Sequence, residues 1–403
     1  MQASTSGASK RVAFLSPSGQ LGGAEICLLD MIAVLREVRP DWELMLITVS
    51  PGPLAERALA MGVSVSVLRL PPEIAELGDS GSRGRAFLLM NLLHAFPAVR
   101  RYRDELRAAL NGFQPHIVHT NGFKMHVLGA MACPAPSRLV WHLHDYISNR
   151  PVMARLLRHY ARRTHAIIAN STSVAENARL TLGSKREIVP ILNVVDLAEF
   201  SPQGEHLDLD ALSGMPSAEV GTVRVGLLAT MAWWKGHRLF LDAMAKVPRD
   251  SKVRGYIIGG ALYQTDSRQE TIEALRAYAE KVGVPDRVGF TGFVAGPAKA
   301  MRALDVVVHA STEPEPFGRV IVEAMACGRP VISSGVGGAG EILMMGDFAL
   351  AFKLNDADSL AKAIVKMAGD PALRALLGRN GLNTARERFG RDRLARELPP
   401  VYE

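Results

Sequence analysis

The chain has 403 residues, of which 48% are hydrophobic and 22% charged, a composition typical of a globular protein. A single hydrophobic core rarely grows past roughly 250–300 residues, so this length predicts two sizeable cores. No run of 18 uncharged apolar residues occurs, which argues against a membrane-spanning helix. The first ten residues lack the apolar centre of a signal peptide and are expected to form a flexible leader. Cys27, Cys133 and Cys327 form no CxxC pair, so we expect buried reduced thiols and a cytoplasmic location.

The net charge of +7 is unevenly distributed. Residues 1–82 carry a net −3, residues 83–163 a net +10, and residues 164–403 a net zero. The basic character therefore lies in one segment of 81 residues. Such a segment is typical of proteins that bind nucleic acid, a membrane surface or an anionic ligand.

Short β-branched runs alternate with helical patterns along the chain, as in parallel sheets covered by helices on both faces. The stretch 193–221 is polar, contains several Gly and Pro residues, and is typical of an interdomain linker. We therefore expect an α/β fold with two facing, doubly wound, Rossmann-like domains. The expected strands are 11–17, 43–50, 63–70, 116–120, 138–145 and 165–171, then 223–229, 253–260, 287–293, 305–311 and 329–335.

Loops that follow strands are the candidate sites, because open α/β sheets bind ligands at the carboxyl ends of their strands. Gly22 and Gly23 follow the first strand and precede a helix expected from about Ala24. A glycine pair at a helix N-terminus suits a bound anion, and a tight turn explains it equally well. The pair is not the GxGxxG of dinucleotide-binding proteins, which argues against a dehydrogenase.

Two further loops carry polar residues. His142 and His144 lie two apart on a strand, so both point to one side of the sheet. A metal pair is conceivable, but no further His-rich spacing supports one. Lys235 closes the loop after the first strand of the second domain and could neutralise a phosphate, although a solvated lysine is commoner. Trp233 and Trp234 could line a cleft or cover the domain surface.

The stretch 313–332, EPEPFGRVIVEAMACGRPVI, places carboxylates and an arginine just before an apolar helix. The helix is expected to start near Gly318 and to stop at the Gly-Arg-Pro that follows it. Arg319 then occupies the first turn, where the helix dipole disfavours a cation by roughly 0.3–1 kcal/mol. Glu313 or Glu315 would offset that charge, and so would a bound phosphate.

Together these loops resemble those of the family-4 retaining glycosyltransferases of the GT-B fold, over nearly the whole chain. Glu315, followed after seven residues by Glu323, resembles the signature pair of that family. The resemblance implies transfer of a sugar from a nucleotide-diphosphate sugar to an acceptor hydroxyl, with retention, in bacterial glycan, glycolipid or glycoconjugate synthesis. The further matching stretches are GGAE (22–25), HD (144–145), NVVDLAEF (193–200) and KGH (235–237).

The resemblance also implies a domain organisation. An acceptor-binding Rossmann-like domain is expected over residues 1–197. A Rossmann-like domain that binds the nucleotide-sugar donor is expected over residues 198–387, with a cleft between the two domains. Residues 388–403 resemble the closing helix that returns to the first domain.

Each candidate residue takes the role that the resemblance implies. Glu323 is expected to bind the donor ribose and Glu315 to face the donor sugar. The amides of residues 317–320 are expected to meet the diphosphate opposite Lys235, because the leaving nucleoside diphosphate gains negative charge. The implied catalytic residues are His144, Lys235 and Glu315. The implied donor-binding residues are Gly22, Gly23, Thr230, Lys235, Val294, Phe317, Gly318, Arg319, Val320 and Glu323.

Family members are expected to react by front-face attack, with the leaving phosphate taking the proton of the acceptor. Neither a metal ion nor another cofactor is expected, since these loops contain no Asp-x-Asp clamp. Two departures concern diphosphate binding. Thr230 stands where the family has an arginine, for which Arg319 is a possible substitute. The sequence 193–196 reads Asn-Val-Val-Asp instead of Asn-Gly-Val-Asp.

Other functions stay open. A GT-B nucleotide-sugar epimerase or hydrolase would release the sugar instead of transferring it, and the Glu315–Glu323 pair argues against this. A nucleic-acid-binding or scaffold protein would use the basic segment. Aromatic residues are sparse in that segment and no known nucleic-acid motif occurs, so no nucleic-acid partner is expected.

The basic segment 83–163 alternates apolar helical runs with arginines, as a membrane-surface helix does. Each cation near anionic lipid contributes about 1 kcal/mol to binding. Solvated arginines on helices packed against the sheet are the alternative, and an anionic or lipid-linked acceptor is a third. We expect an anionic partner, with peripheral contact at the inner face of the membrane as one form of it. The arginines are Arg83, Arg85, Arg100, Arg101, Arg103, Arg107, Arg150, Arg155, Arg158, Arg162 and Arg163.

Overall fold

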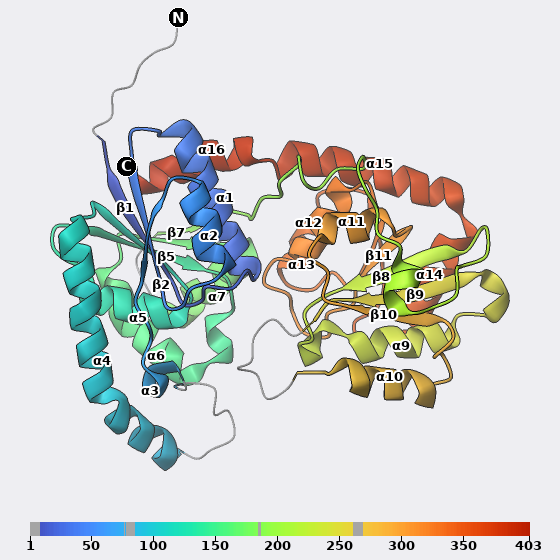
Figure 1. Ribbon diagram of the computed structural model, residues 1–403, viewed down its shortest axis with the longest axis horizontal. Coiled ribbons are helices and arrows are strands. Elements are labelled where there is room, and N and C mark those ends of the chain that lie inside the picture. The colour runs from blue at the N-terminus through green and yellow to red at the C-terminus, as the bar shows by residue number, and fades with distance from the viewer. Residues whose placement is uncertain (1–8, 76, 78–84, 184–186, 261–268) are drawn as a thin grey trace, which may run out of the picture. The chain divides into compact units, whose positions relative to one another are not determined.

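The computed structural model describes residues 9–75, 77, 85–183, 187–260 and 269–403, with the side chains of residues 85–93 excepted. Within it the chain forms two compact units (Figure 1). Unit 1 comprises Met1–Leu192 and Arg391–Glu403, and unit 2 comprises Asn193–Gly390. The last helix, α16 (Arg391–Tyr402), therefore belongs to unit 1 although it follows unit 2 in the sequence. Most of the expected leader lies outside the described residues.

Unit 1 is built on one parallel sheet, in which seven described strands have the order β3-β2-β1-β4-β5-β6-β7. The first six strands lie where the apolar runs predict them. The seventh was missed, because three residues are too few to show a periodicity. The strands are β1 (Arg11–Ser16), β2 (Glu43–Thr48), β3 (Ser64–Val67), β4 (Ile117–Asn121), β5 (Arg138–Leu143), β6 (Ala166–Ala169) and β7 (Ile188–Pro190).

Helices cover both faces of this sheet. Leu139, Trp141 and Leu143 of β5 belong to a core shared with α4 to α7. The alternating residue His142 points to the other face, where α1 packs beside α16. The helices are α1 (Gly23–Val38), α2 (Pro53–Ala60), α3 (Pro72–Ala75), α4 (Arg85–Phe113), α5 (Phe123–Ala132), α6 (Pro151–Tyr160) and α7 (Thr172–Leu182).

Unit 2 is built on a second parallel sheet, whose six described strands have the order β10-β9-β8-β11-β12-β13. The first five along the chain lie where they are predicted, and the three-residue β13 was missed. The doubly wound α/β architecture expected from the sequence is therefore present in both units. The strands are β8 (Val223–Leu228), β9 (Val253–Ile258), β10 (Val288–Gly292), β11 (Val306–His309), β12 (Val331–Ser333) and β13 (Ala349–Ala351).

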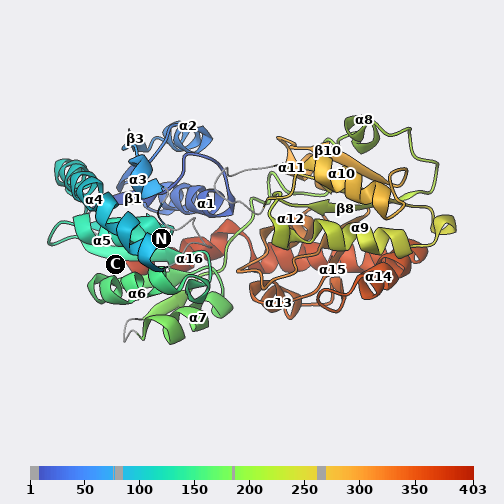
Figure 2. The ribbon, with the colours of Figure 1, turned by 90° about the horizontal axis from the view of Figure 1, so that it is seen from below.

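The helices of unit 2 also lie on both faces of its sheet. In Figure 2, α9 and α10 lie in front of the strands, while α14 packs beside α9, and α15 packs against α12. The helices are α8 (Leu209–Ser213), α9 (His237–Lys246), α10 (Ile272–Lys281), α11 (Pro297–Arg302), α12 (Arg319–Ala326), α13 (Gly338–Leu343), α14 (Ala357–Gly369) and α15 (Pro371–Arg388).

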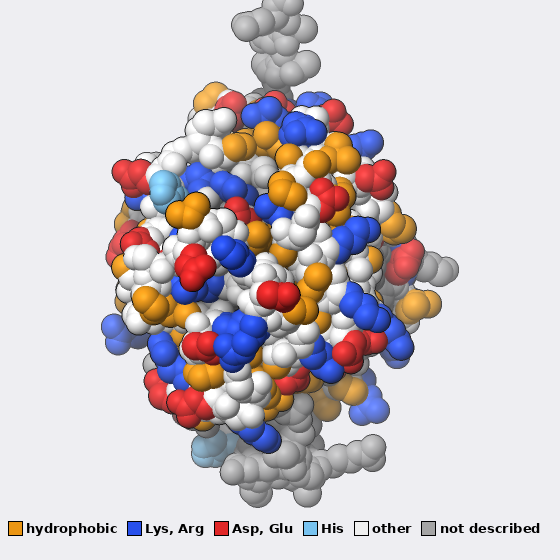
Figure 3. Space-filling view, turned by 90° about the vertical axis from the view of Figure 1, so that its right-hand side faces the viewer, with side chains coloured by type: hydrophobic (Ala, Val, Ile, Leu, Met, Phe, Trp, Pro, Cys, Tyr) orange, Lys and Arg blue, Asp and Glu red, His pale blue; other side chains and the backbone are white. Residues whose placement is uncertain are grey.

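The mixture of charges on the surface agrees with the sequence. On the face drawn in Figure 3, Lys and Arg side chains are interspersed with Asp and Glu, as the zero net charge of residues 164–403 leads one to expect. None of the described helices combines the length and the apolar character that crossing a membrane requires.

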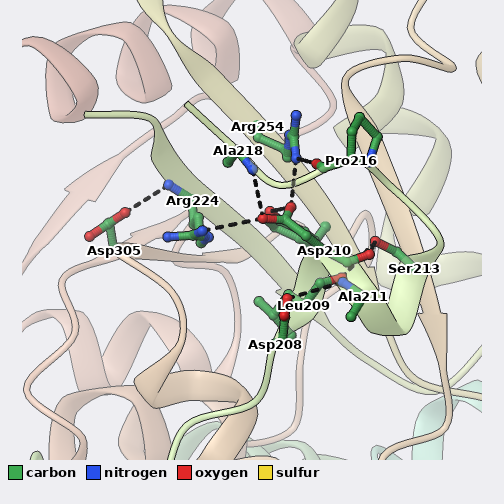
Figure 4. A network of polar contacts seen from close by, with 11 residues as sticks. Asp208, Leu209, Asp210, Ala211, Ser213, Pro216, Ala218, Arg224, Arg254 and Asp305 are labelled. Carbon is green, nitrogen blue, oxygen red and sulfur yellow. Dashed lines mark hydrogen bonds and ion pairs between the residues drawn. The ribbon is translucent and has the colours of Figure 1, made fainter. Parts of the chain in front are cut away.

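The stretch 193–221 is not merely the linker that its composition predicts, because it belongs to unit 2 and contributes the buried Asp210 of α8. Asp210 is 4% exposed and accepts hydrogen bonds from Arg254 and Tyr256 of β9, both at 2.6 Å, and from Arg224 of β8 at 3.3 Å. Figure 4 shows this network, in which the Ala218 amide donates a further bond at 3.0 Å. The stretch is thus tied to two central strands.

The environment of Asp210 determines its protonation. Burial raises the pKa of this carboxyl, but the hydrogen bonds from Tyr256, Ala218, Arg254 and Arg224 outweigh burial and hold the pKa well below its usual range. Asp210 is therefore a carboxylate at neutral pH, and its charge is balanced within the network.

We predict that Asp210→Asn lowers the free energy of unfolding by about 3 kcal/mol, because it leaves two arginines facing a neutral group. Denaturant unfolding at pH 7 measures this change. Asp208→Asn is the matched control, since Asp208 is an exposed N-cap that accepts a bond from the Ala211 amide, and asparagine caps a helix equally well. An equal loss in both variants would contradict the assignment.

Comparison of the wild type with Asp210→Asn also predicts how the stability of the protein depends on pH. The Asp210 pKa is lower in the folded state than the value of about 3.9 in the unfolded state, so the unfolded state binds the proton first as pH falls. The stability difference between the wild type and Asp210→Asn should be constant above about pH 5 and should shrink as the pH falls below about 4. A difference that grows on acidification would show that the sign is wrong.

Candidate functional site

The loops after β8 and β11 approach each other at the carboxyl edge of the unit 2 sheet, where these two strands are neighbours. A 3-10 turn, Trp233–Lys235, follows β8. Gly236 comes next with φ of 78°, and a Cβ on it would lie 1.9 Å from the Ala310 carbonyl oxygen. Only glycine fits this close approach, which brings Lys235 to the end of β11.

Lys235 forms an ion pair with Glu315, as the two loops meet. The Lys235 Nζ donates to both carboxylate oxygens of Glu315, at 2.9 and 2.8 Å. It also lies 3.9 Å from the centre of the Trp234 ring, a cation–π contact. Trp234 thus packs against Lys235, whereas Trp233 is exposed.

Glu315 is 8% exposed and has further donors around it. The Ser311 hydroxyl donates at 2.8 Å, and the His309 Nε2 lies 3.4 Å from the same carboxylate oxygen. Burial raises the Glu315 pKa, but the Lys235 ammonium and the bond to His309 outweigh it and hold the pKa well below its usual range. Glu315 is therefore an anion whose charge is held by a fixed cation.

His309 and Ser311 were not among the predicted site residues. They lie two residues apart at the end of β11, so both point to the side of the sheet where Glu315 lies. A histidine at the end of an otherwise apolar strand was the signal that could have identified them. The His309 Nδ1 lies 3.0 Å from the Ser333 hydroxyl of β12, and this contact fixes the ring.

Helix α12 begins at Arg319, one residue after Gly318 as predicted. Gly318 adopts φ of 98° at the N-cap, a left-handed conformation that side chains rarely adopt. Phe317 before it is buried. The first amides of any helix lack partners within the helix, so those after Gly318 can meet an anion.

The partner of Arg319 differs from the one expected. We expected Glu313, Glu315 or a bound phosphate to offset its charge, and the structure pairs it with Glu323, one turn along α12, at 3.1 Å. Spacing of four along a helix brings two long side chains together, whereas Glu315 lies before the helix and is held by Lys235. The Arg319 Nη1 also donates to the Val194 carbonyl at 3.3 Å, which anchors the start of unit 2.

The other candidates of unit 2 lie at the same edge of the sheet. Thr230 follows β8, Val294 follows β10 and Val320 is the second residue of α12, and all three are half-buried. In the described part of the chain, no hydrogen bond or ion pair links Thr230 or Val294 to the Lys235–Glu315 pair. Their place in the site therefore rests on the shared edge alone.

The glycine pair of unit 1 caps α1, which begins at Gly23. The Gly22 amide donates to the Glu25 carboxylate at 3.1 Å, so a capping interaction occupies the amide at which an anion was expected. Gly22 is buried, whereas Gly23 is exposed. The tight-turn interpretation thus has direct support, and an anion would meet Gly23 more readily.

The two histidines of β5 point to one side, as predicted. Their ring centres lie 3.9 Å apart, with His142 fully buried and His144 half-buried just after the strand. The His144 Nε2 lies 3.4 Å from the Asn121 side-chain oxygen at the end of β4. This contact orients the ring of His144 at the carboxyl edge of the unit 1 sheet.

The basic segment lies on α4, α6 and the turns beside them. Arg83 lies outside the described residues, and the side chain of Arg85 is not described. Arg107 and Arg158 donate to backbone carbonyls of Met131 and Thr181, so these two arginines stabilise the fold. The exposed apolar side chains near the arginines are Phe96, Val152 and Leu156.

Both units match known protein families. Residues 21–199 match the family described as Glycosyltransferase Family 4. Residues 221–384 match the family described as Glycosyl transferases group 1. The two matches cover most of unit 1 and of unit 2.

Two characterised relatives have related activities. The 2-deoxystreptamine N-acetyl-D-glucosaminyltransferase of Streptomyces fradiae is 28% identical, over 93% of this chain and 91% of its own length. The lipopolysaccharide core biosynthesis glycosyltransferase LpsE of Rhizobium meliloti is 29% identical over 58% of this chain. That match spans 62% of LpsE, so this chain covers less than two thirds of the length of that relative.

Solved structures resemble the whole chain. HepE from Anabaena, in complex with UDP and glucose, has a TM-score of 0.78 and 26% identity, over 97% of this chain and 99% of HepE. A sucrose-phosphate synthase from Thermosynechococcus elongatus has a TM-score of 0.77 at 20% identity, over 98% of both chains, and this likeness concerns the fold alone.

We predict strong coupling between Lys235 and Glu315 in a double-mutant cycle. Lys235→Met or Glu315→Gln should each lower the free energy of unfolding by about 3 kcal/mol, because each leaves a partly buried charge without its partner. The double variant should lose about as much as either single one, not the sum. Denaturant unfolding measures all three. Glu313→Gln, an exposed change two residues away, should stay within about 0.5 kcal/mol of the wild type, and additive losses would argue against the pair.

Proposed function

Because the chain belongs to the family-4 glycosyltransferases, we propose that it transfers a sugar from a nucleotide-diphosphate donor to an acceptor hydroxyl with retention of anomeric configuration. Its GT-B fold, expected from the sequence, is the fold of HepE over nearly the whole length of both chains. Family membership supports the reaction class. The stereochemistry, the substrates and the residue roles are our proposals.

The observation that carries the proposal is the Lys235–Glu315 pair at the carboxyl edge of the unit 2 sheet. Breaking a sugar–phosphate bond leaves negative charge on the nucleoside diphosphate and positive charge on the sugar. Lys235 would stabilise the first, and the carboxylate of Glu315 would stabilise the second. A fixed ion pair in a partly buried site supplies both charges without reorganising solvent.

The amides at the start of α12 would bind the diphosphate beside Lys235. Gly318 supports this role because its left-handed conformation leads the chain into the helix without a side chain at the entry. Glu323 would bind the donor ribose from the second turn of α12, where Arg319 holds it in place. Arg319 would add a second cation near the phosphates, in place of the arginine that Thr230 replaces.

We propose no metal ion or other cofactor in this reaction, since a lysine and helix amides take the part that a divalent ion plays elsewhere. His144 would take part in catalysis, and Gly22 and Gly23 in donor binding, as the family resemblance implies. As in HepE, which was solved with UDP and with UDP-glucose, a UDP-sugar is the first donor to test.

The acceptor would be anionic or lipid-linked. LpsE and LpsB of Rhizobium meliloti act in lipopolysaccharide core biosynthesis, and the basic segment lies in unit 1, the proposed acceptor-binding unit. Exposed arginines such as Arg155 would face such an acceptor or an anionic membrane surface. We propose a cytoplasmic enzyme with peripheral contact at the inner face of the membrane.

We predict that Glu315→Gln and Lys235→Ala each lower kcat at least tenfold, about 1.4 kcal/mol of transition-state stabilisation. Glu323→Gln should mainly raise the KM for the donor, because it removes a contact to the nucleotide. Nucleoside diphosphate release, measured over a donor panel that begins with UDP-glucose, gives both constants. Glu313→Gln is the control with unchanged kinetics, and near wild-type kcat in both the Glu315 and Lys235 variants would refute the site.

We predict that the product keeps the anomeric configuration of the donor and that EDTA leaves the rate unchanged. The proposed site neutralises the diphosphate with Lys235 and backbone amides, so chelation removes nothing that the reaction uses. Proton NMR of the product assigns the anomer. An inverted product or complete loss of activity in EDTA would contradict the proposal. Equal sugar release with and without acceptor would favour the epimerase or hydrolase alternative.

A further inference from the structure

A thiol and two imidazoles meet on the face of the unit 1 sheet that α1 and α16 cover. Cys27, His142 and His144 each offer one ligand atom, and these atoms all lie within 4.8 Å of one another. Cys27 and His142 are buried, whereas His144 is half-buried. Transfer chemistry of the proposed kind uses neither Cys27 nor His142.

The fold brings these residues together from distant parts of the chain. Cys27 lies in the second turn of α1, on the buried side of that helix. His142 and His144 alternate with apolar residues at the end of β5, so both project toward α1. The parallel register of β5 with β4 and β6 fixes their position along the sheet.

The environment of the His142 side chain points to a bound ligand. It is fully buried, and within the described residues neither of its ring nitrogens has a hydrogen-bond partner. A buried polar group without a partner costs stability, so it needs an explanation. An imidazole whose two ring nitrogens both lack a partner can offer one of them to a metal ion.

We propose that Cys27, His142 and His144 bind a thiophilic divalent cation, with Zn²⁺ as the natural ion. One thiolate with two imidazoles suits Zn²⁺, whereas Mg²⁺ and Ca²⁺ prefer oxygen ligands. Zn–S and Zn–N bonds of about 2.3 and 2.0–2.1 Å place the ligand atoms of a tetrahedral site roughly 3.5 Å apart. The three side chains need to approach one another by about 1 Å, and a water molecule or another ligand would take the fourth position.

Binding of the metal ion releases one proton. The Cys27 thiol gives its proton to solvent as the sulfur–metal bond forms, and the two imidazoles bind through neutral nitrogens. No oxidant or reductant is required. Affinity should therefore rise with pH as long as the protein stays folded.

The consequence for activity rests on the proposed function. If His144 lies at the donor sugar, a metal ion that takes its nitrogen removes it from the substrate, and the ion inhibits the enzyme. Removing the ion with EDTA then restores the rate instead of lowering it. The site is inhibitory and separate from any catalytic metal.

The test uses Co²⁺ as a spectroscopic substitute for Zn²⁺ on the full-length protein. Co²⁺ bound to a thiolate gives a sulfur-to-metal charge-transfer band and intense visible bands when four-coordinate. We expect both bands at one equivalent of Co²⁺, and their loss when one equivalent of Zn²⁺ is added. Spectra without a sulfur band, or bands that Zn²⁺ does not remove, would overturn the proposal.

Three variants locate the ligands. Cys27→Ala and Cys27→Ser should each abolish the charge-transfer band and weaken Co²⁺ binding at least about tenfold, because even partners outside the ligand set change affinity by 10–100-fold. His142→Gln should weaken binding similarly. Circular dichroism and the melting temperature verify that each variant is folded, and the serine variant keeps the test decisive if the alanine variant is not.

The matched controls are other thiols and another buried histidine. Cys133→Ala and Cys327→Ala change the two remaining cysteines, and His126→Gln changes a fully buried histidine that stacks on Trp141 of β5. All three should keep the wild-type Co²⁺ spectrum. Loss of the band in a control, or its persistence in Cys27→Ala, would place the metal elsewhere and refute the site.

The activity measurement separates this proposal from the proposed function. Zn²⁺ should inhibit the wild type, while Cys27→Ala should keep the wild-type rate and resist Zn²⁺ at least tenfold better. Binding of Co²⁺ at Cys27 without inhibition would support the metal site and count against His144 at the donor. An inactive protein that still binds Co²⁺ at Cys27 would count against the proposed function alone.

Discussion

The candidate site of unit 2 depends on one buried anion, the carboxylate of Glu315. Lys235 donates to both of its oxygens, and Ser311 and His309 contact one of them. Taking a carboxylate out of water is costly unless each oxygen is satisfied, so the loops after β8 and β11 have to close on each other. Gly236 makes this closure possible, because any side chain there would collide with the Ala310 carbonyl. The charge arrangement is thus fixed by the fold, which is the preorganisation that the proposed reaction would require.

Unit 1 is organised by a contrast between the two faces of its sheet. The face under α4 to α7 is mostly apolar, whereas the face under α1 and α16 contains His119 and His142 in edge-to-face contact. Tyr402 of α16 lies 2.7 Å from the His119 Nδ1, and Arg391 at the start of the same helix pairs with Asp30 of α1 at 2.9 Å. The last helix is therefore attached to unit 1 by polar contacts at both of its ends. A buried polar layer of this kind specifies one position of the helix better than apolar packing does.

Much of this fold could be predicted from the sequence, because long apolar strands with loops rich in glycine reveal themselves locally. The apolar run between Gly318 and the Gly-Arg-Pro stop likewise located α12, to within one residue at its start. Contacts between distant residues could not be predicted in the same way. The sequence pattern placed Glu315 near Arg319. In the structure Glu315 forms its ion pair with Lys235 instead, because the loops after β8 and β11 meet in the fold. The role of Asp210 was hidden for the same reason, since its partners lie on β8 and β9 while the stretch around it has the composition of a linker. The three-residue strands β7 and β13 carry no periodicity at all.

Cys27 could not be identified as a candidate ligand from any single motif of the sequence. The spacing of His142 and His144 suggested a metal pair, and the absence of a third histidine nearby in the sequence argued against one. The third group comes instead from α1, more than a hundred residues earlier, and it is a thiol. This combination is compatible with the proposed reaction, in which Lys235 and backbone amides would neutralise the diphosphate and a cation would add nothing. Under that proposal, an ion bound to His144 would compete with the substrate for the ring. The cluster of soft ligands in unit 1 therefore favours an inhibitory ion over a catalytic one.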